Sequence, residues 1–241
     1  AAWVYNVRTG EIIVNTDASI RVRHDAVKEL VRRFVDPDVG VATGRDVSRG
    51  KDEGDRNLGE AGYVGYEMWV RDLETDAGGI VGASGSLYAI RRGLHEHVLP
   101  AALSRDFASA LVARENGYRA VSVPEAVCVV PRTDSLRKEF RRKVRTMVRG
   151  METLWFKRHL LNPLRHGRFA WKLFSHKVCR WLVPWAALMG LVGLFMVDFH
   201  PAVHVALAVG IAGIVALTVV AWKWPRDRGM PRVISLPAFA L

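Results

Sequence analysis

Four charged side chains in this sequence are of types that bind metal ions, transfer protons or bind phosphate groups. Asp17 follows the apolar run Ile12–Val14, and a carboxylate at a strand end is an oxygen ligand of the kind that holds Mg²⁺ or Mn²⁺ against a diphosphate. Asp106 lies in the first turn of a predicted helix, where it could act as a general base. Arg142 and Arg145 are three residues apart, so they share one helix face and suit a diphosphate. Together these are the parts needed to displace a nucleoside diphosphate from a sugar: they would bind a metal, neutralise the leaving group and deprotonate an acceptor hydroxyl.

The segment Gly78–Ile90 is rich in glycine, alanine and serine before it becomes strand-like. A row of small residues indicates that something approaches the backbone closely, either another strand or a ligand. Ser84, Gly85 and Ser86 lie at the centre of this segment and are therefore candidates for a ligand site.

The elements around Asp17 predict a parallel sheet. Residues 11–16 have the continuous apolar pattern of a buried strand, residues 24–35 have helical periodicity, and residues 39–43 form a second apolar strand. A strand, a helix and a strand within about 35 residues predict parallel pairing, and ligands bind beyond the carboxyl ends of such strands. Alternatively, Asp17 or Ser19 only caps the helix that follows.

The next stretch of the chain predicts more helices and strands of the same domain. Residues 45–57 are polar and rich in glycine, which predicts a loop. Helices are predicted at 58–73 and at 104–115, the second with a serine N-cap. Residues 120–130 predict a strand that bends or lies at an edge, because Pro124 interrupts it. The first of these helices carries the larger side chains Tyr63, Tyr66, Trp69, Val70 and Leu73.

Residues 136–155 predict a basic amphipathic helix. One stripe of its surface is apolar and the rest carries lysine and arginine, a pattern that suits the surface of an anionic membrane. The alternative is a solvated basic face above a stripe that packs into a core. Residues 160–177 mix aromatic and basic side chains, which suits the head-group layer. The apolar stripe consists of Leu136, Phe140, Val144, Met147 or Val148, Met151 and Trp155.

Two apolar runs, residues 181–197 and 202–222, are long enough to cross roughly 30 Å of hydrocarbon as helices. The link between them, Asp198–Pro201, is too short for anything but a tight hairpin. Lysine and arginine flank the two runs on the outside and are absent from the link, which predicts cytoplasmic flanks. Residues 225–232 then form a cytoplasmic loop, and a third span could begin at Val233.

The formal net charge of +11 indicates an anionic partner, and residues 132–180 and 223–232 carry most of it. Because these residues flank the apolar runs, lipid is the nearer anion, and we set nucleic acid aside. Cys128 and Cys179 lie in apolar sequence without metal-ligand spacing, which favours free thiols in a reducing compartment. The chain begins at Ala1 and ends in an apolar run, so we expect a fragment of a longer protein.

In its order of motifs the chain resembles the second half of a family 2 glycosyltransferase of the processive kind, similar to cellulose and hyaluronan synthases. The resemblance runs from about Gly10 to about Trp224 and rests on four segments followed by a membrane pair. Thr16–Ser19 resembles the metal-binding DxD segment, Gly82–Arg92 the strand at the sugar site, Ser104–Asp106 the acidic pair that ends in the catalytic base, and Arg142–Arg145 the QxxRW diphosphate motif.

The resemblance implies an α/β fold in four parts. These are a partial GT-A (Rossmann-like) domain at 1–133, interfacial amphipathic helices at 134–177, a transmembrane helical hairpin at 178–224, and a cytoplasmic loop with the start of a third span at 225–241. It also implies a membrane-bound, inverting glycosyltransferase of polysaccharide synthesis. The enzyme would move a sugar from a nucleotide-sugar donor, expected to be UDP-linked, to a saccharide or lipid-linked acceptor.

The resemblance assigns one role to each candidate residue. Asp106 would be the catalytic base, and Asp17 would hold Mg²⁺ or Mn²⁺. Arg142 and Arg145 would bind the donor diphosphate. The protein would be a multi-pass protein of the inner membrane, in contact with membrane lipids, with its catalytic part in the cytoplasm. The donor and acceptor sugar site would contain Ser84, Gly85 and Ser86.

The chain departs from the family pattern at several positions. Ser19 replaces the second DxD acid, Arg105 replaces the first residue of the acidic pair, and Arg142 and Thr146 replace the Gln and Trp of the last motif. The nucleoside-binding strands of the family would precede this chain. The alternative function is a non-catalytic, membrane-anchored basic scaffold that binds anionic lipid. It explains the charge and the spans but leaves the two aspartates without a role.

Overall fold

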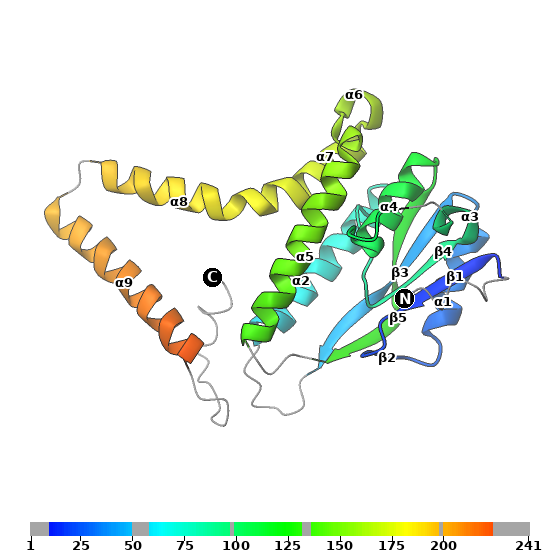
Figure 1. The fold of residues 1–241 in the computed structure, drawn as a ribbon, viewed down its shortest axis with the longest axis horizontal. Coiled ribbons are helices and arrows are strands. Elements are labelled where there is room, and N and C mark those ends of the chain that lie inside the picture. Colours follow the sequence, from blue (N-terminus) through cyan, green and yellow to red (C-terminus); the bar gives the residue numbers. More distant parts are fainter. Residues whose placement is uncertain (1–9, 50–57, 97–98, 132–135, 198–199, 224–241) are drawn as a thin grey trace.

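The computed structural model describes residues 10–49, 58–96, 99–131, 136–197 and 200–223. A sheet with flanking helices occupies one end of the molecule, and two long helices extend away from it (Figure 1). In chain order the elements are β1 (Ile12–Thr16), β2 (Arg21–Val22), α1 (Ala26–Arg32), η2 (Arg33–Val35), β3 (Val39–Arg49), α2 (Leu58–Asp76), β4 (Leu87–Arg91), α3 (Arg92–His95), α4 (Arg105–Glu115), β5 (Arg119–Pro131), α5 (Leu136–Phe156), η3 (Arg158–Leu161), α6 (Pro163–His166), α7 (Arg168–Leu173), η4 (Phe174–Cys179), α8 (Arg180–Met196) and α9 (Pro201–Lys223).

The described strands form a mixed sheet in the order β1-β4-β3-β5-β2. β3 and β5 pair in parallel, whereas β4 is antiparallel to both β1 and β3, and β2 is antiparallel to β5. β1 and β3 therefore run in the same direction, as a strand–helix–strand unit requires, but they are not neighbours. The predicted parallel sheet is wrong in this respect, because the chain returns and inserts β4 between the two.

The predicted burial of the first strand is also wrong. Among the described residues β1 pairs with β4 alone, so it lies at an edge of the sheet. Ile13 is its buried residue, and Val14 and Thr16 are exposed. Because Thr16 pairs with Leu87, the end of β1 lies beside the start of β4.

Pro124 bends its strand and does not mark an edge, since β5 lies between β3 and β2. The register of β5 against β3 shifts between Gly44 and Arg45, where residues 124–126 form a bulge. A Cβ atom at Gly44 would lie 2.6 Å from the carbonyl oxygen of Ala126. Glycine is therefore required where the bulge presses on β3.

Helices cover both faces of the sheet, because successive residues of a strand point to opposite sides. Val41 and Ile90 pack on the side of α4. Ala42 and Ala89 pack on the other side, against Leu30 of α1. The core therefore lies in two layers, one on each face of β3 and β4.

Residues 158–173 pack onto the sheet domain, although their sequence predicted an interfacial segment. Phe169 and Leu173 are buried against Leu111 of α4. Trp171 lies on the outer side of the same segment and is 66% exposed. The segment thus has one side in the core and one side exposed.

Helix α5 has two different sides, and its apolar stripe faces away from the sheet domain. Thr153 and Leu154 are buried where α5 meets α4. At about 100° per residue, the stripe lies about 120–220° around the helix from Thr153. The alternative in which this stripe packs into a core is therefore wrong. The side chains of Phe140, Val144, Met147, Val148, Met151 and Trp155 are between 42% and 71% exposed.

Helices α8 and α9 coincide with the two apolar runs and are long and apolar enough to cross a membrane. Their 17 and 23 residues correspond to about 26 Å and about 35 Å of helix. Their most apolar stretches have no buried residue. The two helices diverge from their connection (Figure 1), and the rings of Phe195 and His204 stack near it, 6.1 Å apart. Residues 198–199 and the predicted third span lie outside the described residues.

Candidate functional site

Asp106 lies in the first turn of α4, as predicted, directly against the small-residue segment. Its carboxylate oxygen Oδ1 accepts a hydrogen bond from Ser104 Oγ at 2.6 Å. The other oxygen, Oδ2, is 3.1 Å from the position that a Cβ atom would take at Gly85. A side chain at position 85 would therefore displace the carboxylate. The structure brings these two predicted site residues together.

Asp17 is joined to the same segment through the backbone. Its amide donates to the carbonyl oxygen of Ser86 at 3.1 Å, and the hydroxyl of Thr16 donates to the same oxygen at 3.2 Å. The amide of Ser86 in turn donates to Ser84 Oγ at 3.1 Å. A continuous series of contacts thus leads from Asp17 through residues 84–86 to the carboxylate on α4.

Asp46 belongs to this site although its sequence position predicted a loop. It lies on β3, which continues six residues beyond its predicted end at Thr43. Its Oδ2 accepts from Ser84 Oγ at 2.6 Å, and its Oδ1 accepts from Cys128 Sγ at 3.1 Å. Burial and the neighbouring Asp46 carboxylate raise the pKa of the Cys128 thiol, so this thiol stays protonated and donates. No local sequence signal links these residues, because their contacts are all long-range.

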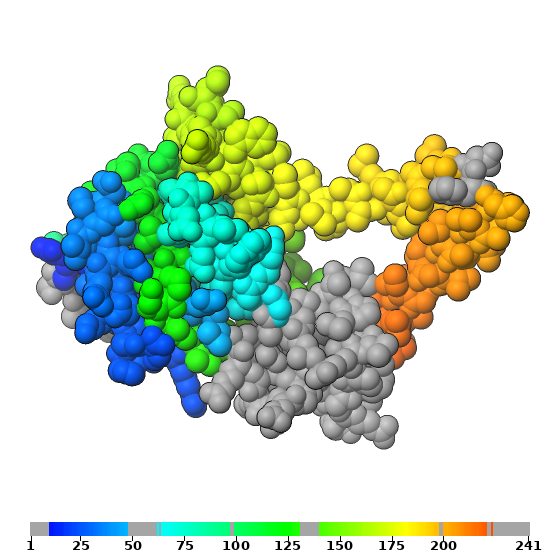
Figure 2. Space-filling model, turned by 180° about the vertical axis from the view of Figure 1, so that it is seen from behind, coloured from blue at the N-terminus to red at the C-terminus, as the bar shows by residue number. Residues whose placement is uncertain are grey.

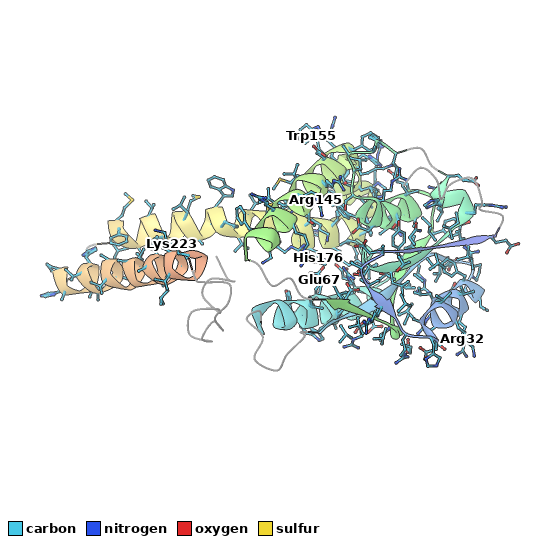
Figure 3. All side chains as sticks on the ribbon, turned by 60° about the horizontal axis from the view of Figure 1, so that its bottom comes forward. Arg32, Glu67, Arg145, Trp155, His176 and Lys223 are labelled. Atoms are coloured by element: carbon cyan, nitrogen blue, oxygen red, sulfur yellow. The ribbon has the colours of Figure 1, made fainter. Side chains whose placement is uncertain are left out.

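Arg142 lies on the side of α5 that faces α4, and Arg145 lies nearly at a right angle to that side. Thr153 Oγ1 accepts from the amide of Ser104 at 2.9 Å, which attaches α5 to the start of α4. By helical geometry Arg142 is about 20° and Arg145 about 80° around the axis from Thr153. They precede it by about 16 Å and about 12 Å along the axis, and Arg145 is exposed (Figure 3). Arg142 thus points toward the side of α4 and Arg145 sideways from it, and both stand apart from Asp106 along the helix.

The residues present fit a metal only if the substrate completes its coordination. Among the residues that the structure describes, no three histidine, cysteine, aspartate or glutamate side chains gather into a metal site. Asp17 offers one exposed carboxylate, and Ser19 is exposed beside it. Mg²⁺ is commonly held by one or two carboxylates together with the phosphates of a substrate. Asp17 is compatible with that kind of site and not with a preformed cage.

The inner face of α2 was not found from the sequence. The aromatic side chains that suggested its packing side are exposed: Tyr66 and Trp69 each by 57%. Glu67 and Glu74 are buried in their place. Burial by itself would raise the pKa of Glu67, but a hydrogen bond from His176 and nearby cations outweigh it and hold this pKa well below its ordinary value (Figure 3).

The comparisons with known proteins agree with this fold. The family model described as Glycosyl transferase family group 2 matches residues 12–222, and the chain belongs to this family. Among solved structures, the mannosyltransferase PcManGT from Pyrobaculum calidifontis, in complex with GDP-Man and Mn²⁺, is similar, with a TM-score of 0.57 and 23% identity. The match covers 96% of this chain and 60% of that chain. No curated protein matches the chain.

The fold class expected from the sequence is confirmed: a GT-A-like α/β domain followed by two long apolar helices that could span a membrane. The chain spans about 60% of the length of the solved mannosyltransferase. The cellulose- and hyaluronan-synthase-like kind, and the division at residues 133, 177 and 224, stay predictions.

Proposed function

We propose that this chain is the acceptor side and membrane anchor of an inverting glycosyltransferase. The enzyme transfers a sugar from a nucleotide-sugar donor to a hydroxyl acceptor in polysaccharide synthesis. The observation that carries the proposal is the close approach of Asp106 to Gly85. Oδ2 of Asp106 lies 3.1 Å from the position that a Cβ atom would take at Gly85. The glycine lets the carboxylate lie against the small-residue segment, and the carboxylate supplies the base that an acceptor hydroxyl needs.

The hydrogen bonds of Asp106 indicate which of its oxygens acts. Oδ1 is occupied by the hydroxyl of Ser104, whereas Oδ2 faces Gly85. The acceptor hydroxyl would give its proton to Oδ2 as its oxygen bonds to the anomeric carbon. The bond between that carbon and the diphosphate breaks in the same displacement, with inversion. The hydrogen bond from Ser104 fixes the carboxylate in this orientation.

The donor diphosphate would lie between Asp17 and α5. A divalent ion, Mg²⁺ or Mn²⁺, held by Asp17 and the diphosphate would neutralise charge on the leaving group. Arg142 and Arg145 of α5 would stabilise the same charge. The donor is a nucleoside diphosphate sugar. UDP-linked sugars remain our expectation, and GDP-linked sugars should be assayed beside them because the solved mannosyltransferase has GDP-Man bound.

The enzyme would lie at the inner membrane with its sheet domain in the cytoplasm. The exposed stripe of α5 faces away from the sheet domain, and basic side chains border it, which suits an anionic lipid surface. Gly150 of α5 is packed against the Trp181 ring at the start of α8, 3.3 Å from its Cβ position. The surface helix and the first apolar helix are therefore joined where α5 would meet the membrane.

The deciding experiment is Asp106→Asn in the intact protein, reconstituted in lipid. Loss of the base should reduce transfer by about 100-fold to 10,000-fold, while nucleotide-sugar binding measured by titration calorimetry stays unchanged. Glu29→Gln is the matched control, because Glu29 is a first-turn acid on α1, on the opposite face of the sheet. Unchanged transfer by Asp106→Asn would contradict the assignment. If the unmodified protein neither transfers nor hydrolyses any nucleotide sugar, the scaffold alternative is favoured.

A further inference from the structure

Helix α2 turns a charged face toward the interior. Glu67, Arg71 and Glu74 follow one another at helical spacing and are 7–8% exposed. Buried charges at this spacing need partners of opposite charge, because transfer of an unpaired charge from water is costly. The partners identify what this face of α2 holds in place.

The partners come from one short segment at the start of the first apolar helix. His176 Nδ1 lies 2.7 Å from Glu74 Oε1, and its Nε2 lies 3.3 Å from Glu67 Oε1 (Figure 3). Arg180 Nη1 lies 2.8 Å from Glu67 Oε2. Each ring nitrogen of His176 therefore faces one of the two carboxylates. His176 belongs to the π-helical turn η4, a form that is frequent at functional sites.

Residues 172–177 and Glu74 also contact residues 79–82, which follow α2. Glu74 Oε2 accepts from the amide of Val81 at 3.3 Å. Lys172 Nζ donates to the carbonyl oxygen of Gly79 at 2.5 Å. Lys177 Nζ lies 5.1 Å from the centre of the Phe107 ring and 3.6 Å from the Cβ position of Gly82. Side chains from residues 172–177 therefore contact positions 79 and 82, and Glu74, which is held by His176, binds position 81 between them.

Residues 79–82 lead directly into the sugar-site loop 84–86. Phe107, which lies under Lys177, is the residue after Asp106 on α4. Gly82 faces Phe107 as Gly85 faces Asp106. A shift of the first part of the segment would therefore be passed to the part that touches the carboxylate.

We propose that Glu74 and His176 are positioning residues that hold residues 79–86 against α4 and so set the distance between Gly85 and Asp106. Through this pair the start of α8 fixes the place where the acceptor binds. The inference rests on the proposed function for its consequence in transfer. Its structural part, the attachment of the loop to η4, can be tested independently.

The structural test is hydrogen exchange of the full chain in lipid nanodiscs. His176→Gln should accelerate exchange of the Val81 amide and the following loop by about 10-fold or more, because Glu74 loses the ring nitrogen that orients its carboxylate. His159→Gln is the matched control: His159 pairs with Glu115 at 2.8 Å but is 53% exposed. It should leave the loop unchanged. Equal exchange of the loop in His176→Gln and the unmodified chain would overturn the proposal.

A general loss of folding is distinguished by the amides of α4, which should keep their protection. If they do not, Glu74→Gln replaces His176→Gln as the test. Glutamine keeps an oxygen that can accept from Val81 while it removes the charge opposite His176. Faster exchange in the loop with α4 still protected supports the proposal. Loop exchange unchanged in Glu74→Gln refutes it.

The consequence for transfer is measured on the intact protein. His176→Gln should lower kcat about 10-fold to 100-fold without changing the dissociation constant of the nucleotide sugar, and His159→Gln should change neither. A lower kcat that merely follows a lower fraction of folded protein would count against a positioning role. If Asp106→Asn keeps full transfer while His176→Gln still loosens the loop, the proposed function fails and the attachment stands. The reverse result removes the attachment and keeps the function.

Discussion

The sheet domain and the long helices after it differ in where their large apolar side chains lie. In the sheet domain Leu30, Ile90 and Leu111 are at most 1% exposed. In α5 and α8 most of the large apolar side chains are outside, with Trp155 exposed by 71% and Met189 by 75%. Large apolar side chains are therefore buried in the sheet domain, as in water-soluble proteins, and exposed on the long helices.

This difference fits the proposal that the second region contacts a membrane. Contiguous exposed apolar surface of this extent marks a protein or membrane contact in soluble proteins. α5 is apolar on one side and basic on the rest, which suits a position along a membrane surface. α8 and α9 carry almost no charge between Trp181 and Trp222 and stand away from the sheet domain (Figure 2). The exposed apolar surface thus grows along the chain. It is one stripe on α5, which would lie on lipid, and most of the surface of α8 and α9, which would cross it.

The largest effect should come from truncation inside the sheet domain. Leu111→Ala removes a side chain of α4 that is fully buried against α7. It should lower the free energy of unfolding by about 2–5 kcal/mol. Met147→Ala on the exposed stripe should change it by no more than about 0.5 kcal/mol. Thermal unfolding of both variants in the same detergent, followed by near-ultraviolet circular dichroism, measures the difference. Similar losses in both would show that the stripe packs against protein.

Periodicity predicted the elements of the sheet domain well because it depends on local spacing. The helices that contain Leu30 and Leu111 and the strand interrupted by Pro124 lie where they were expected. The strand order was not predictable in the same way. β4 enters between β1 and β3 through antiparallel pairs such as Ile13 with Ile90, and no spacing within β1 signals that partner.

The candidate site shows the same limit. Asp106 could be selected from its place in the first turn of a helix, and Gly85 from its small neighbours. Asp46 could not, since its role follows from contacts with Ser84 and Cys128, 38 and 82 residues away. The orientation of α2 was hidden because aromatic side chains normally indicate the packing face. Here Glu67 packs inward instead, since its cationic partner Arg180 lies 113 residues later.

An intermediate effect should follow from loss of one buried charge on α2. Glu67→Gln should lower the free energy of unfolding at pH 7 by about 1–3 kcal/mol. Because the pKa of Glu67 is lowered in the folded protein, its contribution is complete above the ordinary value of 4.5 and is lost as the pH falls below it. The difference in the free energy of unfolding between Glu67→Gln and the unmodified protein should therefore become smaller from pH 7 to pH 3.

The control for this measurement is Glu125→Gln. Glu125 pairs with Arg33 at 3.1 Å, but its side chain is 54% exposed, so its loss should change stability by about 0–1 kcal/mol. Denaturant titrations of both variants at the two pH values give the comparison. If the loss of unfolding free energy in Glu67→Gln stays constant with pH, the charge of Glu67 is not what stabilises its contacts with His176 and Arg180.

The smallest energetic effect, and the sharpest test of the comparison, comes from labelling two exposed valines. Val148 lies on the stripe of α5 and Val35 on the sheet domain, 48% and 87% exposed. A spin label on a cysteine at either position, with Cys128 and Cys179 replaced by alanine, should change stability by about 0.5 kcal/mol or less relative to that cysteine-free parent. In lipid nanodiscs the label at 148 should collide mainly with oxygen, which concentrates in lipid, and the label at 35 mainly with a water-soluble nickel complex. Equal access of the nickel complex to both labels would place the stripe in water and end the comparison.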